Sequence, residues 1–111
     1  MPYFAPLLRD RTVSITSAAT PTINTDLVDE FEISALATNI TSFTTNLSGA
    51  PINSQRLIIK IFDSSGHTLT WGSAFSGSSL PTATNAGKYL HVLLKYNSLT
   101  SKWECMATQE I

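Results

Sequence analysis

Few residues of this chain have the types and spacing that catalysis or metal binding requires. The two histidines, His67 and His91, have no cysteine or second histidine at the spacing of metal ligands. Glu30 and Glu32 stand two residues apart and would share one face of a strand, whereas paired glycosidase carboxylates lie across a cleft. The Gly-x-Ser-x-Gly pattern of a hydrolase nucleophile is absent from the sequence. We therefore expect no catalytic residue, no metal site and no cofactor.

Two other potentially reactive side chains, Asp63 and Cys105, are better explained by structural roles than by chemical ones. Asp63 precedes two serines and Gly66, a composition that favours a turn capped by the aspartate. Cys105 is the only cysteine, so an internal disulfide is excluded. It follows Trp103 at a spacing of two, which favours a small core side chain over a reactive thiol. Abundant serines without a base of known geometry do not indicate a nucleophile.

Composition favours an all-β domain with an uncharged surface. Fifteen threonines and fourteen serines make up 29 of the 111 residues, while charged residues are only 14%. Threonine suits a pleated surface and serine suits turns. A net charge of -1 provides no basic patch for nucleic acid. No stretch approaches the roughly 20 apolar residues of a membrane span, and no signal peptide is evident, so we expect neither nucleic acid nor membrane as a partner.

The rest of the domain is organised around residues 56–71. Residues 56–62 are apolar on both faces, as in a strand within a sheet, and 63–67 read as a turn. Residues 68–71 alternate and predict the returning strand of a hairpin. A second hairpin is predicted from 88–97 and 102–109, with Trp103, Cys105 and Ala107 directed inward. Further strands are expected at 12–17, 28–36 and 39–45, and loops at 18–26 and 46–55.

These elements predict one all-β domain, an antiparallel β-sandwich or jelly roll over residues 12–111. Residues 1–11 are expected to form an extended arm, because Pro2 and Pro6 interrupt regular structure. An apolar arm needs a docking place, either on its own domain or on a neighbouring subunit. Its candidate partner-binding residues are Tyr3, Phe4, Leu7, Leu8, Arg9 and Arg11.

Residues 72–87 are the longest loop-like stretch, with three glycines, Pro81 and many hydroxyls. Loops of this length inside compact domains are usually functional or mobile. Phe75 and Leu80 are expected to anchor it. The candidate contact residues in this loop are Ser73, Phe75, Ser78 and Leu80.

Two segments carry a resemblance to a known class of proteins. They are Gln-Arg-Leu-Ile-Ile-Lys-Ile-Phe-Asp with Gly-His-Thr-Leu-Thr-Trp-Gly-Ser-Ala-Phe, and Gly-Lys-Tyr-Leu-His-Val-Leu-Leu-Lys-Tyr-Asn with Ser-Lys-Trp-Glu-Cys-Met-Ala-Thr-Gln. This sequence resembles an all-β module of tailed-bacteriophage virion proteins, found in tail-fibre, minor structural and capsid decoration proteins. The resemblance covers roughly residues 12–109. The Leu-Thr-Trp-Gly run and the Lys-Trp pair are its most specific parts.

The resemblance implies a structural protein located in the virion. It implies a homotrimer without catalytic residues, whose partners are the major capsid protein or, alternatively, tail proteins. Because the module stands almost alone after a short arm, a capsid decoration protein is the leading hypothesis. A tail-fibre or tail-tip module that contacts a host receptor is the alternative. A carbohydrate-binding domain is a third hypothesis, based only on Trp71, Trp103 and the tyrosines.

Overall fold

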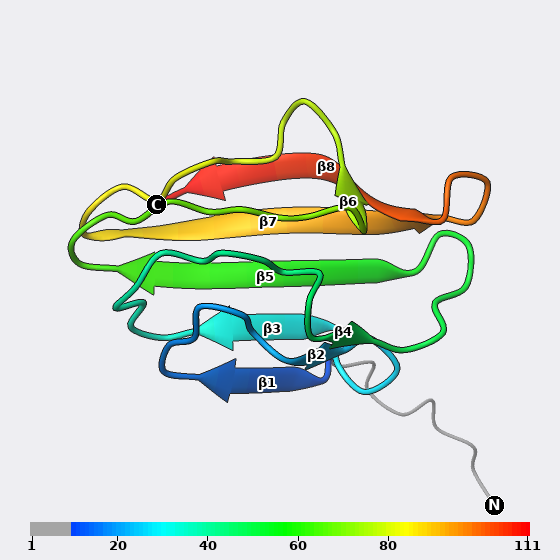
Figure 1. Ribbon diagram of the computed structural model, residues 1–111, viewed down its shortest axis with the longest axis horizontal. Coiled ribbons are helices and arrows are strands. Elements are labelled where there is room, and N and C mark those ends of the chain that lie inside the picture. Colours follow the sequence, from blue (N-terminus) through cyan, green and yellow to red (C-terminus); the bar gives the residue numbers. More distant parts are fainter. Residues whose placement is uncertain (1–9) are drawn as a thin grey trace, which may run out of the picture.

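The computed structural model describes residues 10–111, and the statements on structure below concern these residues (Figure 1). They form an all-β domain without helices, and they include no helix that is long and apolar enough to cross a membrane. The eight strands are β1 (Thr12–Ile15), β2 (Ile23–Asn24), β3 (Glu30–Ile33), β4 (Leu47–Ser48), β5 (Arg56–Asp63), β6 (Phe75–Ser76), β7 (Lys88–Asn97) and β8 (Lys102–Glu110).

Six strands form one mixed sheet in the order β1-β3-β5-β7-β8-β6 (Figure 1). β1, β3 and β5 run parallel to one another, whereas β5, β7 and β8 are antiparallel neighbours. The prediction of a purely antiparallel sheet was therefore wrong. Parallel neighbours need a crossover connection, and the chain provides one after β1 and another after β3.

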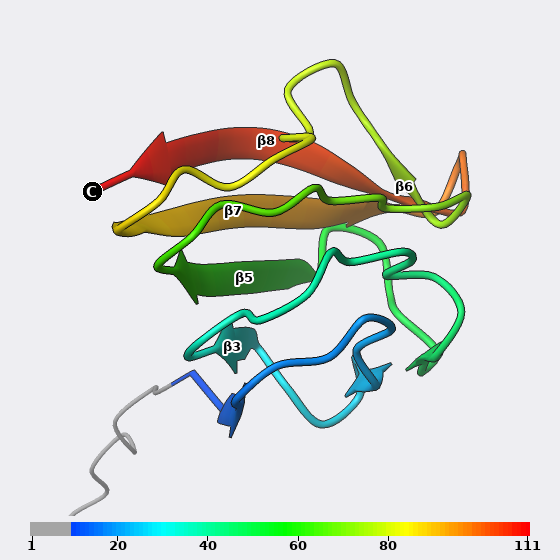
Figure 2. The ribbon, with the colours of Figure 1, turned by 60° about the vertical axis from the view of Figure 1, so that its left-hand side comes forward.

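The two crossover segments and the long connection from β5 to β7 lie on the same face of the sheet (Figure 2). They comprise residues 16–29, 34–55 and 64–87, and we call them the covering layer, except for β6, which joins the edge of the sheet beside β8. Within it, β2 and β4 pair in parallel, and Ile40 forms a parallel bridge with Leu69. The core lies between the covering layer and the sheet, and its buried side chains include Ile23, Ile40, Phe43, Leu69 and Trp71 from the layer and Phe31, Ile33, Leu57, Ile59, Ile61, Val92 and Leu94 from the sheet.

The predicted hairpin at 56–71 exists only as its first strand and its turn. β5 pairs with β3 and β7, and not with the residues that follow the turn. Residues 68–71 instead cross into the covering layer, where Leu69 bridges Ile40 and Thr68 bridges Ala83. Both flanks of β5 are already occupied, so its continuation has no free edge to pair with. The strand expected at 39–45 is reduced to the Ile40 bridge, while β2, β4 and β6 form inside predicted loops.

The hairpin of β7 and β8 is confirmed, with one change in its register. A bulge in β8 lies opposite the step from Leu93 to Leu94, where Ala107 pairs with Leu93 and Cys105 pairs with Leu94. One extra residue moves every later side chain to the other face of the strand. Trp103 is therefore buried and Cys105 packs against the core as predicted, but Ala107 is exposed on the opposite face.

Candidate functional site

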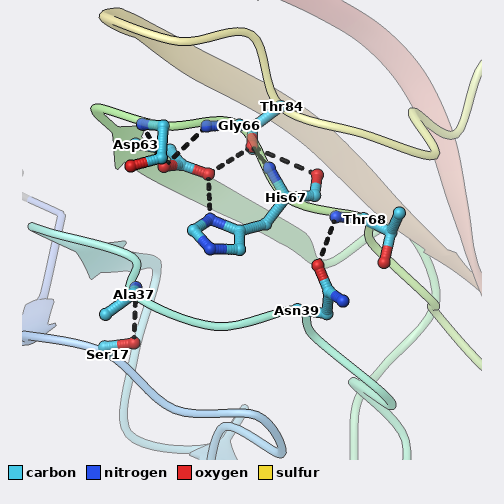
Figure 3. A network of polar contacts seen from close by, with 9 residues as sticks. Ser17, Ala37, Asn39, Asp63, Gly66, His67, Thr68 and Thr84 are labelled. Atoms are coloured by element: carbon cyan, nitrogen blue, oxygen red, sulfur yellow. Dashed lines mark hydrogen bonds and ion pairs between the residues drawn. The ribbon is translucent and has the colours of Figure 1, made fainter.

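A dense polar network surrounds Asp63 at the end of β5 (Figure 3). Its Oδ1 atom accepts hydrogen bonds from the backbone amides of Ser65 and Gly66 at 2.9 and 3.0 Å. Its Oδ2 atom lies 2.7 Å from Nδ1 of His67 and accepts a 2.6 Å hydrogen bond from the hydroxyl of Thr84. The hydroxyl of Thr84 also accepts a hydrogen bond from the backbone amide of His67 at 2.9 Å. The predicted turn-capping role of Asp63 is confirmed.

Hydrogen bonding keeps this carboxylate ionised. Burial alone would raise the pKa of Asp63, but the hydrogen bonds from Thr84, His67 and the two amides outweigh burial and lower the pKa to about 2. Because a carboxylate only accepts hydrogen bonds, Nδ1 of His67 carries the proton in this contact. All of these donors bind the two oxygens of a carboxylate that has no exposed surface. The network therefore ties the turn after β5 to the covering layer, and it does not present a base to a substrate.

The structure also bears on three other candidate activities: metal binding, a reactive thiol and sugar binding. Among residues 10–111 no three His, Cys, Asp or Glu side chains lie close enough to hold a metal ion. Burial raises the pKa of the Cys105 thiol, which opposes formation of the reactive thiolate. Trp71 and Trp103 are both buried in the core, so neither ring is free to stack on a sugar.

Arg11, at the root of the predicted arm, is tightly bound to its own domain. Its guanidinium forms a bidentate ion pair with Asp29, with contacts of 3.0 and 3.1 Å, and donates to the carbonyl of Asp26 at 2.8 Å. Its backbone amide donates to Asp29, and its carbonyl accepts from the amides of Asp29 and Glu30. We predicted a partner-binding role for Arg11, but these contacts occupy its side chain. Tyr3, Phe4, Leu7, Leu8 and Arg9 lie outside the described residues.

Three loops lie at the same end of the domain as this anchor, and we call this end the loop end: residues 25–29, 49–55 and 97–101 (Figure 1). Asp26 accepts a hydrogen bond from the amide of Ala50 at 3.0 Å, which joins the first two loops. Asn53 accepts one from the amide of Ser98 at 3.0 Å, which joins the second and third. Gln55 donates to the carbonyl of Thr25 at 2.8 Å. These cross-links hold the three loops in a fixed arrangement.

Each of these loops exposes one large apolar side chain. Leu27, Ile52 and Leu99 are exposed by 64%, 72% and 93%. A hollow of about 430 Å³ lies between Ile52 and the Arg11 anchor, and its other lining residues are Thr25, Asp26, Asp29, Ala50, Asn53, Ser54 and Gln55. Exposed apolar residues on fixed loops, with Ile52 among them beside a hollow, are typical of a protein contact surface. None of these residues was predicted from the sequence, although Ile52 and Leu99 each stand as a single large aliphatic side chain in a polar loop, whereas Leu27 precedes the buried Val28.

The loop at 72–87 is only partly exposed. Phe75 belongs to β6 and is buried against Trp71 and Phe43, with ring centroids 5.3 and 6.2 Å away. Its predicted anchoring role is confirmed, and burial makes its side chain unavailable to a partner. Leu80 is half-buried against the core, whereas Ser73 and Ser78 are exposed.

Comparison with known proteins supports the fold of this chain and provides no information on its function. No family model matches the sequence, and no curated protein matches it. Among solved structures, this chain is similar to a chain in the structure of a chaperone–substrate complex, with a TM-score of 0.52 and 14% sequence identity. The similarity covers 88% of this chain, which spans 18% of that chain. The all-β architecture is thus shared with part of a much longer polypeptide.

Proposed function

We propose that this chain is a structural protein of a tailed-bacteriophage virion, bound to the capsid exterior as a decoration protein. In this proposal the two-layer domain is a β-sandwich, it assembles as a homotrimer, and its main partner is the major capsid protein. The proposal starts from the sequence resemblance at residues 56–75 and 88–108. One structural observation supports a role in attachment.

That observation is the common location of the arm anchor and the loop end. Asp26 connects them directly, since its carbonyl binds Arg11 and its carboxylate binds the loop of Ile52. Arg11, the last residue of the predicted arm, is fixed beside the loops of Leu27 and Ile52. In this proposal the partner that the arm binds also contacts these two loops. Two modest contacts that act together retain a protein on a lattice better than either alone.

Particle binding tests this proposal. Particles that lack the protein are incubated with the purified chain or with its Leu99→Glu or Ile52→Glu variant, and bound protein is quantified after sedimentation. Burying a leucine or isoleucine contributes about 1.5–3 kcal/mol, so each variant should bind at least about tenfold more weakly. The matched control is Met106→Glu, which places the same charge at an exposed residue of β8. Equal binding of all four proteins would refute the role of the loop end.

A tail location is the second candidate. Residues 77–82 form a loop that projects beyond the β8 edge of the sheet and exposes Ser78 (Figure 1). A receptor-binding tail module would use such a projecting loop. Electron microscopy of particles labelled through this protein distinguishes the two locations. Label on the head supports the decoration protein, and label on the tail supports the alternative.

A further inference from the structure

A small hollow opens on the face of the sheet opposite the covering layer, which we call the open face (Figure 2). Successive residues of a strand point to opposite faces, so every second residue of β5 lies on the open face, between residues that are buried under the layer. The hollow has a volume of about 140 Å³ and is lined by Glu32, Ile33, Ser34, Lys60, Phe62 and Tyr89. None of these six residues takes part in the proposed attachment to the capsid.

Strand register brings a polar pair and an aromatic pair together in this hollow. Glu32 pairs with Lys60 across β3 and β5, and Phe62 pairs with Tyr89 across β5 and β7. Because Lys60 and Phe62 stand two residues apart on β5, their side chains point to the same face of the sheet. The hollow therefore combines two ionised groups with two aromatic rings.

The aromatic pair provides an accessible apolar wall. The ring centroids of Phe62 and Tyr89 lie 4.8 Å apart, with 43° between the ring planes. Tyr89 is 48% exposed, in contrast to the buried rings of Trp71 and Trp103. Phe62 is half-buried and supports the ring of Tyr89 from the neighbouring strand. A partly exposed ring in a hollow can pack against the apolar C–H face of a sugar ring.

The polar side chains of the hollow are held in position and retain hydrogen-bonding capacity. Nζ of Lys60 lies 2.6 Å from Oε2 of Glu32, and Oε1 of Glu32 accepts a 2.9 Å hydrogen bond from the hydroxyl of Ser14. The hydroxyl of Ser34 donates to the carbonyl of Ile15 at 3.2 Å. A carboxylate accepts, an ammonium donates and a hydroxyl does both, and each forms more hydrogen bonds than these contacts use. The hollow thus offers both donors and acceptors to a ligand.

The charges in the hollow disfavour an ionic ligand. Lys60 and Glu32 neutralise each other, and Glu30 lies 3.7 Å from the same ammonium group. Their hydrogen bond lowers the pKa of Glu32 and raises the pKa of Lys60, so both groups are ionised at neutral pH. An anion would meet these carboxylates, and a cation would meet the ammonium group. A neutral ligand with several hydroxyl groups avoids both repulsions.

We infer that this hollow is a binding subsite for one ring of a neutral carbohydrate. Tyr89 and Phe62 pack against the apolar face of the sugar ring. Glu32, Lys60 and Ser34 form hydrogen bonds with its hydroxyl groups. Sites for drug-sized ligands have volumes of about 300–1,000 Å³, so the smaller hollow suits a single ring. The inference goes beyond the proposed function and does not depend on the virion role, because sugar binding is measured on the purified chain.

Nuclear magnetic resonance titration of the isotope-labelled full chain tests this inference. The probes are glucose, galactose, mannose and N-acetylglucosamine, each added to about 100 mM so that millimolar dissociation constants are detected. At least one of them should shift the amide signals of Glu32, Lys60, Phe62 and Tyr89 to saturation. Inorganic phosphate is the charged comparator and should leave these signals unchanged.

Two variants and one control connect the shifts to the hollow. Tyr89→Ala removes the exposed ring and should weaken binding at least about tenfold, because the apolar contact with the sugar is lost. Glu32→Gln keeps the size of the side chain, removes its charge and should weaken binding at least about fivefold. Leu99→Ala truncates an exposed residue beyond the other end of β7 and should keep the wild-type affinity. Circular dichroism verifies that each variant is folded.

Three results would overturn the inference. The first is the absence of localised shifts with all four sugars. The second is sugar binding that neither Tyr89→Ala nor Glu32→Gln weakens, because the sugar then binds elsewhere. The third is a phosphate titration that shifts the same signals as strongly as the sugars, because Lys60 then acts as a free cation and the hollow does not select neutral ligands.

Discussion

Nδ1 of His67 lies 2.7 Å from Oδ2 of Asp63, four residues earlier in the chain. This contact closes the turn at which the chain leaves β5 and enters the covering layer. The hydroxyl of Thr84 binds the same oxygen from the other end of the long loop. One buried carboxylate thus joins the last strand before the loop to both ends of that loop, and the stability of the covering layer depends on its charge.

Acid should remove this contribution. The pKa of Asp63 is 3.8 as a reference and about 2 in the folded protein. Because the pKa of Asp63 is lower in the folded than in the unfolded protein, the ionised carboxylate stabilises the fold at pH values above about 4. This contribution disappears as the pH falls from about 4 to 2. The shift corresponds to about 2 kcal/mol of unfolding free energy. Urea unfolding of the wild type and Asp63→Asn should therefore differ by at least this amount at pH 7 and converge near pH 2. A difference that stays constant with pH would contradict the role of the charge.

The anchor at Arg11 should control the order of β1 and the ionisation of Asp29. Hydrogen bonds from the side chain and backbone amide of Arg11 lower the pKa of the Asp29 carboxyl. In Arg11→Ala the pKa of Asp29 should rise toward its ordinary value, as measured by nuclear magnetic resonance titration. Hydrogen exchange at the amide of Glu30, which donates to the carbonyl of Arg11, should accelerate. Lys88→Ala, at an exposed residue of β7, is the control and should leave both measurements unchanged.

The sequence predicts the strands with local alternation and fails for the segments between them. β5, β7 and β8 have patterns that are complete within ten residues, so their existence follows from the sequence. The covering layer is held by distant contacts instead. For example, the hydroxyl of Thr44 donates to the carbonyl of Trp71 at 2.8 Å, across 27 residues. A threonine in a polar stretch does not indicate which distant carbonyl it will bind. The sequence therefore could not distinguish the path of residues 68–71 into the covering layer from the returning strand of a hairpin.

The exposed candidate surfaces could not be predicted from the sequence either. Leu99 in a polar turn has the same local pattern as Phe75 in a polar loop, yet one is exposed and the other is buried. What separates them is the set of neighbours, since Phe75 meets Trp71 whereas the loop of Leu99 projects from the end of the β7–β8 hairpin. The bulge that turns Ala107 outward leaves no mark that single-sequence alternation can detect. The all-β class therefore follows from composition, but the mixed strand order and the exposed surfaces follow only from the packing.

Gly72 provides the sharpest test of how the covering layer packs. Its φ of +88° is left-handed, and a Cβ atom there would lie 2.7 Å from Cβ of Thr44 and still closer to its hydroxyl. Thr44 has no freedom to move aside, because its hydroxyl binds Trp71 and also accepts from the amide of Ala74 at 3.2 Å.

Gly87 is the matched control for this position. Its φ of +78° is also left-handed, but a Cβ atom there meets nothing within 4 Å. Gly87→Ala should therefore cost only the backbone strain, about 1–2 kcal/mol of unfolding free energy. Gly72→Ala adds the collision with Thr44 and should cost more than about 3 kcal/mol, measured by urea unfolding. Equal losses in the two variants would mean that residues 44 and 72 are not in contact, and that the covering layer packs differently.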